Sequence, residues 1–229
     1  MISLVANAYP TTAGPSNYEG QQIERVIDYL RSITMNATAN NIQFYLDNGK
    51  IIIDPLPKAD EGEQGENNYK GGPVLIDPSI FNPGIPKDKR QPWDPSNPGN
   101  LESMMLLASI LVHEKYHSEH HDWVDRWSGN KKEQIGLGNP MEFEGHMVGI
   151  GFLDEVIAKL LLKLDDPDIS DSDKANILEK IKTLLQLKIA RIDNLDNLSY
   201  GPQIYNSSKL DELKKHIDKL IEELEKNQS

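Results

Sequence analysis

Two histidines one helical turn apart are the residues of this chain best suited to chemistry. They begin and end the run His113-Glu114-Lys115-Tyr116-His117, an HExxH pattern. Residues four apart share one face of an α-helix, so both imidazoles can reach one metal ion. Glu114 lies about a quarter-turn away, where its carboxylate can take a proton from water without ligating the metal. Composition predicts only roughly 0.01 chance matches to this pattern. The alternative is a solvated, histidine-rich helix face.

The run resembles the metal-binding motif of the zincin metallopeptidases, whose two histidines bind zinc and whose glutamate is the general base. The resemblance extends loosely to 139–151. It implies that His113 and His117 hold Zn²⁺, that Glu114 is catalytic, and that the substrate is a peptide or protein. Lys115 departs from the family, which usually has an uncharged residue there.

The third zinc ligand is the open part of this resemblance. The metzincin branch requires a glycine at 120 and a histidine at 123, where this chain has His120 and Trp123. The gluzincin branch takes a glutamate from a following helix instead. It implies three candidates, which are Glu142, Glu144 and, less typically, His146.

Helix capping separates the two glutamates. Asn139-Pro140 suits the start of a helix, and Glu142 would then close a capping box for its own backbone. Glu144 lies about 200° further round the helix and is followed by Gly145, whose small size lets this helix approach the HExxH helix. Glu144 is therefore the preferred ligand, and Glu142 and His146, which share a face, are the alternatives.

Hydrophobic spacing predicts the helices that position these residues. Apolar residues recur at helical intervals over 23–33, 101–127 and 140–163, with a loop expected over 128–139. Two further amphipathic helices follow, the first with apolar residues from Ile177 to Ile192. The second carries a leucine-rich seam from Leu210 to Leu224.

The β-prone segments are short. Runs at 42–46 and 50–54 around Asn48-Gly49 predict a hairpin. After an acidic, solvated loop over 60–66, the run 73–77 is predicted as an edge strand, because Pro73 cannot donate to a neighbour. In the zincin layout such a strand binds extended substrate. The proline-rich stretch 81–100 is predicted to be irregular and to wall the cleft.

These patterns predict an α+β fold that is mostly helical, with a small antiparallel or mixed sheet over the HExxH helix. Residues 1–165 are expected to form a zincin-like domain. Residues 166–229 are expected to form a helical hairpin that packs on this domain or serves self-association.

Composition narrows the function classes. The chain has 229 residues, a net charge of −12 and no cysteine, which excludes disulfides, thiol nucleophiles and cysteine-bound zinc. The negative charge disfavours nucleic acid as a partner. No apolar run approaches the roughly 18–20 residues of a membrane span. The first 15 residues do not resemble a signal peptide, so a cytoplasmic location and export by a non-classical route both stay open.

We therefore expect a zinc-dependent peptidase. One alternative is a binding or assembly module with a structural or vestigial metal, and another is a toxin-like effector metalloprotease. Spacing does not select the residue that stabilises the oxyanion, for which Tyr69, Tyr200, Tyr205 and His216 are available. His121 continues the face of the two ligand histidines by one more turn.

Overall fold

The computed structural model describes residues 17–56, 64–67, 71–81, 85, 89–120, 131–197 and 207–228, and it describes the backbone alone for residues 17, 131–142, 194–197, 207–210, 213, 225, 227 and 228. In these ranges the protein is mostly helical, with a three-stranded mixed sheet. The predicted mostly helical α+β class is confirmed at this level. The elements are α1 (Asn17–Ser32), α2 (Asn36–Asp47), β1 (Ile51–Ile53), β2 (Gly65–Glu66), β3 (Val74–Ile76), the 3-10 helix η2 (Pro78–Phe81), α3 (Pro98–His120), α5 (Lys131–Leu164), α6 (Asp171–Asn197) and α7 (Ser207–Gln228).

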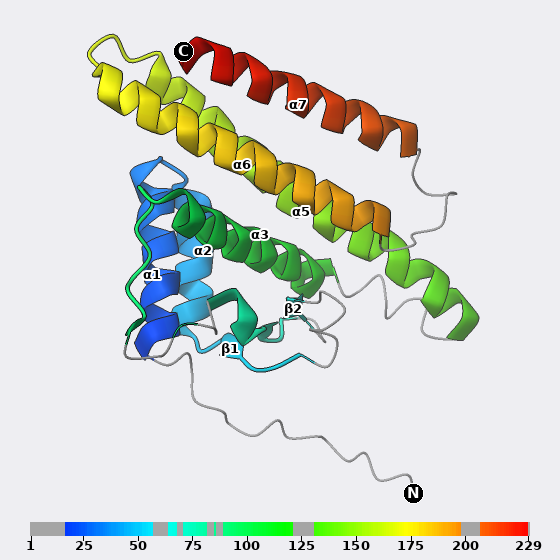
Figure 1. The fold of residues 1–229 in the computed structure, drawn as a ribbon. Coiled ribbons are helices and arrows are strands. Elements are labelled where there is room, and N and C mark those ends of the chain that lie inside the picture. The colour runs from blue at the N-terminus through cyan, green and yellow to red at the C-terminus, as the bar shows by residue number, and fades with distance from the viewer. Residues whose placement is uncertain are drawn as a thin grey trace, which may run out of the picture.

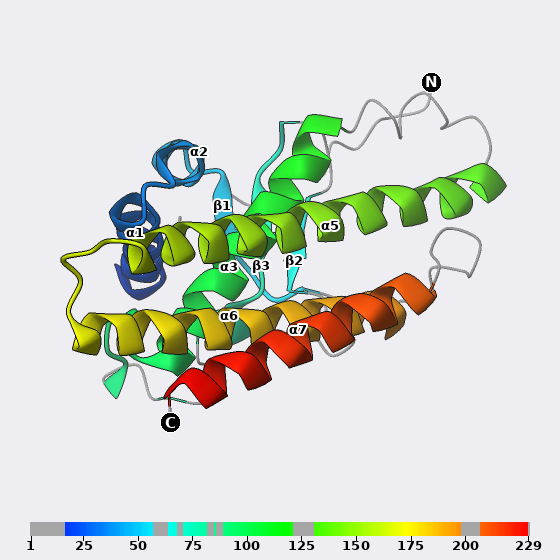
Figure 2. The same ribbon diagram turned by 90° about the horizontal axis from the view of Figure 1, so that it is seen from above.

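Helix α3 lies at the centre of the arrangement (Figure 1). Strands β2 and β3 contact it, and so do α1, α5 and α6. Helix α7 packs on α6 as the outermost element. Seen from above, α5, α6 and α7 run alongside one another while α3 crosses beneath them (Figure 2). The HExxH helix is therefore covered by the sheet on one side and by long helices on another.

The apolar residues of these elements form one core. Fully buried members come from α1 (Leu30), β3 (Ile76), α3 (Met105), α5 (Leu153) and α6 (Leu184). Burial of such side chains stabilises a fold by about 1.5–3 kcal/mol each. The described helices include none whose length and apolar character would let it cross a membrane.

The segment predicted as a β-hairpin is a helix followed by a strand. Residues 36–47 form α2, so the strand predicted at 42–46 is wrong, whereas β1 forms within 50–54. Gly49 takes a φ of +62° just after the helix. Asn-Gly suits this left-handed helix end as well as a hairpin turn. Ala39 and Ile42 are buried at helical spacing, which decides between the two structures.

The predicted edge strand is the central strand. β3 pairs in parallel with β1 and antiparallel with β2, so the sheet order is β1-β3-β2. Pro73 lies just before β3 and costs the ladder no donor. Part of the predicted acidic loop, Gly65–Glu66, forms the edge strand β2 instead, while its residues 60–63 lie outside the described residues.

The loop predicted over 128–139 is also wrong where the structure describes it. Helix α5 begins at Lys131, so Asn139 and Pro140 lie inside it and do not start it. The capping box predicted for Glu142 is therefore absent. A glycine costs a helix about 1 kcal/mol and a proline about 3 kcal/mol. The costs of Gly136, Gly138 and Pro140 predicted a break here, but the backbone of α5 stays helical through all three residues.

One aromatic residue of the proline-rich stretch packs into the core. Trp93 is 2 % exposed and stacks on Phe81 with ring centroids 5.8 Å apart. Its backbone N–H donates to Oε1 of Gln22 on α1 at 2.7 Å. Helix α3 then begins at Pro98, three residues before the predicted start. Residues 82–84 and 86–88 lie outside the described part.

Both predicted C-terminal helices are present. Ile181, Leu184 and Ile192 of α6 belong to the core that also contains α3 and α5. Ile217 of α7 is 1 % exposed, and Leu224 packs against the same core. The described part of the leucine seam is thus used within the chain.

Candidate metal centre

A polar cluster interrupts the buried part of α3. The helix is apolar through Leu107, Ile110 and Leu111, all of which are buried. His113, Glu114 and His117 follow at the same depth, each only 5 % exposed. Buried polar groups are costly unless they bind one another or a ligand. The contacts among these three side chains therefore decide what the cluster can bind.

The three side chains converge. Nε2 of His113 and Nε2 of His117 are 2.7 Å apart, which is a hydrogen-bond distance, so one imidazole donates and the other accepts. Oε1 of Glu114 lies 3.8 Å from Nε2 of His113. One candidate ligand atom from each residue falls within 4.8 Å of the other two. In the part of the chain that the structure describes, no other group of three such residues meets this criterion.

Two glycines of α5 allow it to approach the cluster. A Cβ atom at Gly145 would lie 2.9 Å from Nε2 of His113 and 3.0 Å from Nε2 of His117. One turn further on, a Cβ at Gly149 would lie 3.1 Å from the carbonyl oxygen of Ser109. Any residue other than glycine at these two positions would require neighbouring atoms to shift. The close approach predicted for these two helices is present.

The edge strand β2 lies directly against Glu114. A Cβ at Gly65 would lie 2.5 Å from Cγ2 of Ile110 and 3.0 Å from Oε1 of Glu114. The backbone of an edge strand is therefore in contact with the proposed general base. The sequence reasoning missed this contact, because Gly65 stood in a stretch predicted to be a solvated loop.

Glu144 is held by α3, beside the His–Glu–His cluster and not within it. Its carboxylate accepts a short hydrogen bond from the hydroxyl of Tyr116. Burial, followed by this hydrogen bond and the charge of Glu144, raises the pKa of Tyr116 to about 12. The Tyr116 ring also stacks on His120 at 4.1 Å, and Nδ1 of His120 donates to the carbonyl of Tyr116 at 2.8 Å. The role of Glu144 as a zinc ligand stays a prediction.

His146 packs against the cluster, and Arg191 lies beside His146. The His146 ring meets the His113 ring edge-on, with centroids 4.5 Å apart and planes at 84°. Nη2 of Arg191, from α6, lies 3.5 Å from Nδ1 of His146, at the limit of a hydrogen bond. Arg191 is 6 % exposed. Burial lowers the pKa of its guanidinium, and the negative charge of Glu114 acts in the opposite direction.

Arg191 is a functional candidate that sequence reasoning missed. It stands between Leu187 and Ile192 on a helix predicted only as core or interface. An arginine within an apolar helix face was the one available signal, and nothing in the spacing connected it with the HExxH motif 74 or more residues earlier in the chain.

Of the remaining candidates, the structure describes the side chain of His216 alone. The side chain of Glu142 lies outside the described part, although the backbone places residue 142 in α5. Residues 69, 121, 200 and 205, which include the candidate tyrosines, are outside the described residues. His216 is exposed on α7. The choice among the predicted oxyanion donors therefore stays a prediction.

The donor set suits a zinc ion. Imidazole nitrogens and carboxylate oxygens are the zinc ligands that a protein without cysteine can offer. Residue 145 has no side chain that would crowd the two Nε2 atoms. In comparisons with known proteins, no protein-family model, curated protein or solved structure matched this chain.

Proposed function

We propose that this protein is a zinc-dependent peptidase. The observation that carries the proposal is the buried convergence of His113, Glu114 and His117, in HExxH order, against a glycine of α5 that places no side chain of its own beside the two Nε2 atoms. His113 and His117 would hold the ion through Nε2, in place of the hydrogen bond that they share.

In the proposed mechanism the ion and Glu114 have separate roles. Zinc, when bound, supplies a Lewis acid that polarises a carbonyl group and makes water reactive near neutral pH. Glu114 moves the proton: Oε1 accepts it from the attacking water and passes it to the nitrogen of the leaving amine. Because Glu114 is only 5 % exposed, bulk solvent is largely excluded from this transfer.

The edge of the sheet supports a peptide as the substrate. β2 pairs with β3 on one side, and no strand in the described residues pairs with its other side. A peptide added to that edge in extended form would lie beside Glu114, because the backbone at Gly65 contacts this carboxylate. In this proposal, β2 has the role that the zincin resemblance implied for 73–77.

Glu114→Gln tests the mechanism. The variant should keep one zinc per chain, because the imidazoles are unchanged, and it should lower hydrolysis of unstructured peptides by at least about 100-fold, since the proton acceptor is lost. Elemental assay and mass spectrometry of the products measure the two effects. The matched control is Glu119→Gln, which alters an exposed carboxylate of the same helix that pairs with Lys115. Undiminished hydrolysis by Glu114→Gln, or zinc-supplied wild-type protein without zinc, would contradict the proposal.

Alanine variants of the third-ligand candidates test the ligand set. We propose Glu144, whose carboxylate Tyr116 already holds beside the cluster. Its competitor Glu142 lies one helical turn before Gly145 and so belongs to the same side of α5 as that glycine. Glu144→Ala should lower the zinc content of purified protein to near zero, and Glu142→Ala should leave it unchanged. Zinc lost from Glu142→Ala alone would assign that residue instead.

A second function has one observation in its favour. The His146 ring packs against His113, and a site closed by His146 as a fourth protein ligand would be structural. The protein would then be a binding or assembly module. Substitution of cobalt for zinc separates the two functions. A spectrum that changes on addition of a hydroxamate indicates an exchangeable position, whereas an unchanged spectrum, together with metal loss in His146→Ala, indicates a closed structural site.

A further inference from the structure

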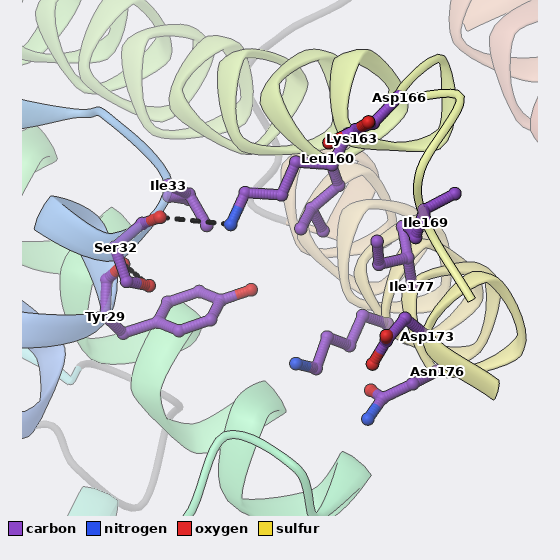
Figure 3. A pocket seen from close by; sticks show the side chains of 11 residues that line it. Tyr29, Ser32, Ile33, Leu160, Lys163, Asp166, Ile169, Asp173, Asn176 and Ile177 are labelled. Carbon is purple, nitrogen blue, oxygen red and sulfur yellow. Dashed lines mark hydrogen bonds between the residues drawn. The ribbon is translucent and has the colours of Figure 1, made fainter.

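A pocket lies at the C-terminal end of α5, away from the candidate metal centre. It has a volume of about 500 Å³ and is lined by the end of α1, the end of α5 and the start of α6 (Figure 3). This is within the range of small-molecule sites, about 300–1,000 Å³. Leu160 in its wall lies fifteen residues beyond Gly145, which is about 22 Å along a helix. The pocket is therefore separate from the HExxH cluster.

The hydroxyl of Tyr29 points into this pocket (Figure 3). Tyr29 is only 6 % exposed, and its hydroxyl has no hydrogen-bond partner in the described part of the chain. Burial raises the pKa of Tyr29 to about 12, so the group is a donor at neutral pH. A buried donor without an acceptor costs about 1–3 kcal/mol. A bound acceptor would remove that cost.

Two lysines face the same space. Nζ of Lys163 donates to the carbonyl of Ser32 at 3.0 Å, which leaves two of its three hydrogens for another acceptor. Nζ of Lys180 lies 5.9 Å from the centroid of the Tyr29 ring. Burial and then the charge of Lys163 lower the pKa of Lys180, and Asp94 acts in the opposite direction. Neither lysine forms an ion pair with any other residue that the structure describes.

The acidic residues of the pocket are already engaged. Oδ1 of Asp166 accepts from the N–H of Asp168 at 3.0 Å. Oδ2 of Asp173 accepts from the hydroxyl of Ser170 at 2.6 Å, at the start of α6. Both carboxylates therefore stabilise local turns. Each keeps its negative charge and a second oxygen, whereas the donors among the lining residues include the Tyr29 hydroxyl and the ammonium groups of Lys163 and Lys180.

We propose that this pocket binds a small organic anion, a carboxylate or a phosphate monoester attached to a short apolar body. The head group accepts hydrogen bonds from the Tyr29 hydroxyl and from the ammonium groups of Lys163 and Lys180. The apolar body lies against Leu160 and Ile177, which line the same pocket. This site is independent of the proposed peptidase activity.

The test is a titration of the full chain followed by NMR of ¹³C-labelled isoleucine methyl groups, because Ile33 and Ile177 line the pocket. Hexanoate, hexyl phosphate and 1-hexanol are the three probes. At least one of the two anions should shift these methyl signals in a saturable way, and the tighter of them identifies the head group. Hexanol should bind at least about tenfold more weakly, since it lacks the charge. Equal binding of hexanol, or no saturable shift with either anion up to about 10 mM, overturns the proposal.

Three variants connect the binding with the named groups. Tyr29→Phe removes only the hydroxyl and keeps the ring in place, and Lys180→Met keeps the length of the side chain. Each should weaken binding of the better anion by about tenfold. Lys159→Met is the matched control. Lys159 lies one turn before Lys163 on α5 and does not line the pocket. Wild-type affinity in both test variants, or equal weakening in the control, overturns the assignment.

Discussion

At the scale of single residues, the proposed site depends on the absence of a side chain at residue 145. Gly145 carries no Cβ, and a Cβ there would lie 2.9 Å from Nε2 of His113 and 3.0 Å from Nε2 of His117. The imidazoles supply the lone pairs for an ion, but the backbone of α5 decides whether an ion has room. Position 145 therefore matters as much to the proposed centre as the histidines themselves.

Gly145→Ala should weaken zinc binding without unfolding the protein. Its Cβ would lie within about 3 Å of both imidazole nitrogens, so we expect zinc affinity to fall by at least about tenfold. Alanine favours a helix over glycine by about 1 kcal/mol. We therefore expect the melting temperature of the zinc-free variant not to fall. Gly151→Ala, whose Cβ would meet no atom within 4 Å, is the control. The idea fails if the two variants bind zinc equally well.

At the scale of elements, two identical dipeptides behave differently. Asn97-Pro98 starts α3: Oδ1 of Asn97 accepts from the N–H of Asn100 at 3.2 Å, and Pro98 is the first helical residue. This is the arrangement expected of an N-cap followed by proline. Asn139-Pro140 has the same local signals but lies inside α5. The orientation of the HExxH helix thus depends on the first pair and not on the second.

Asn97→Ala should lower the free energy of unfolding by about 1 kcal/mol, because the cap of α3 is lost. Asn139→Ala should be neutral or stabilising by up to about 0.7 kcal/mol, because alanine is the better residue in a helix interior. Urea unfolding of both variants beside the wild type measures the difference. Equal losses would show that residue 139 also caps a helix.

At the scale of the whole molecule, the C-terminal helices and the metal centre belong together. Ile181, Leu184 and Ile192 of α6 lie in the core that contains α3 and α5. Arg191 of the same helix reaches His146. By contrast, α7 packs mainly on α6. The boundary predicted after residue 165 would divide this core.

We therefore expect a chain ending at residue 165 to lose cooperative folding, because it would expose apolar residues of α5, such as Val156, that α6 helps to bury. A chain ending at 206, which lacks only α7, should still unfold cooperatively at a lower temperature. Near-ultraviolet circular dichroism and calorimetry measure both. A cooperative transition with bound zinc in the shorter chain would instead establish 1–165 as a domain of its own.

The features predicted correctly from the sequence are local ones. His113, Glu114 and His117 lie within five residues, so the geometry of one helix is enough to bring the two imidazoles together. The longer helices follow from apolar residues repeated every three or four positions. Where two structures share one local signal, as at Asn48-Gly49 and Asn139-Pro140, the prediction was wrong. Packing with residues far along the chain made those choices.

The sequence by itself determined that one helix carries His113, Glu114 and His117, and that the two imidazoles lie on the same face of it. Only the tertiary structure decided what surrounds that point: the edge strand at Gly65, the backbone at Gly145 and the guanidinium of Arg191. The physical reason is that backbone geometry sets contacts over one or two turns, whereas the contacts between Glu114 and its distant neighbours form only when separate elements bury a common core.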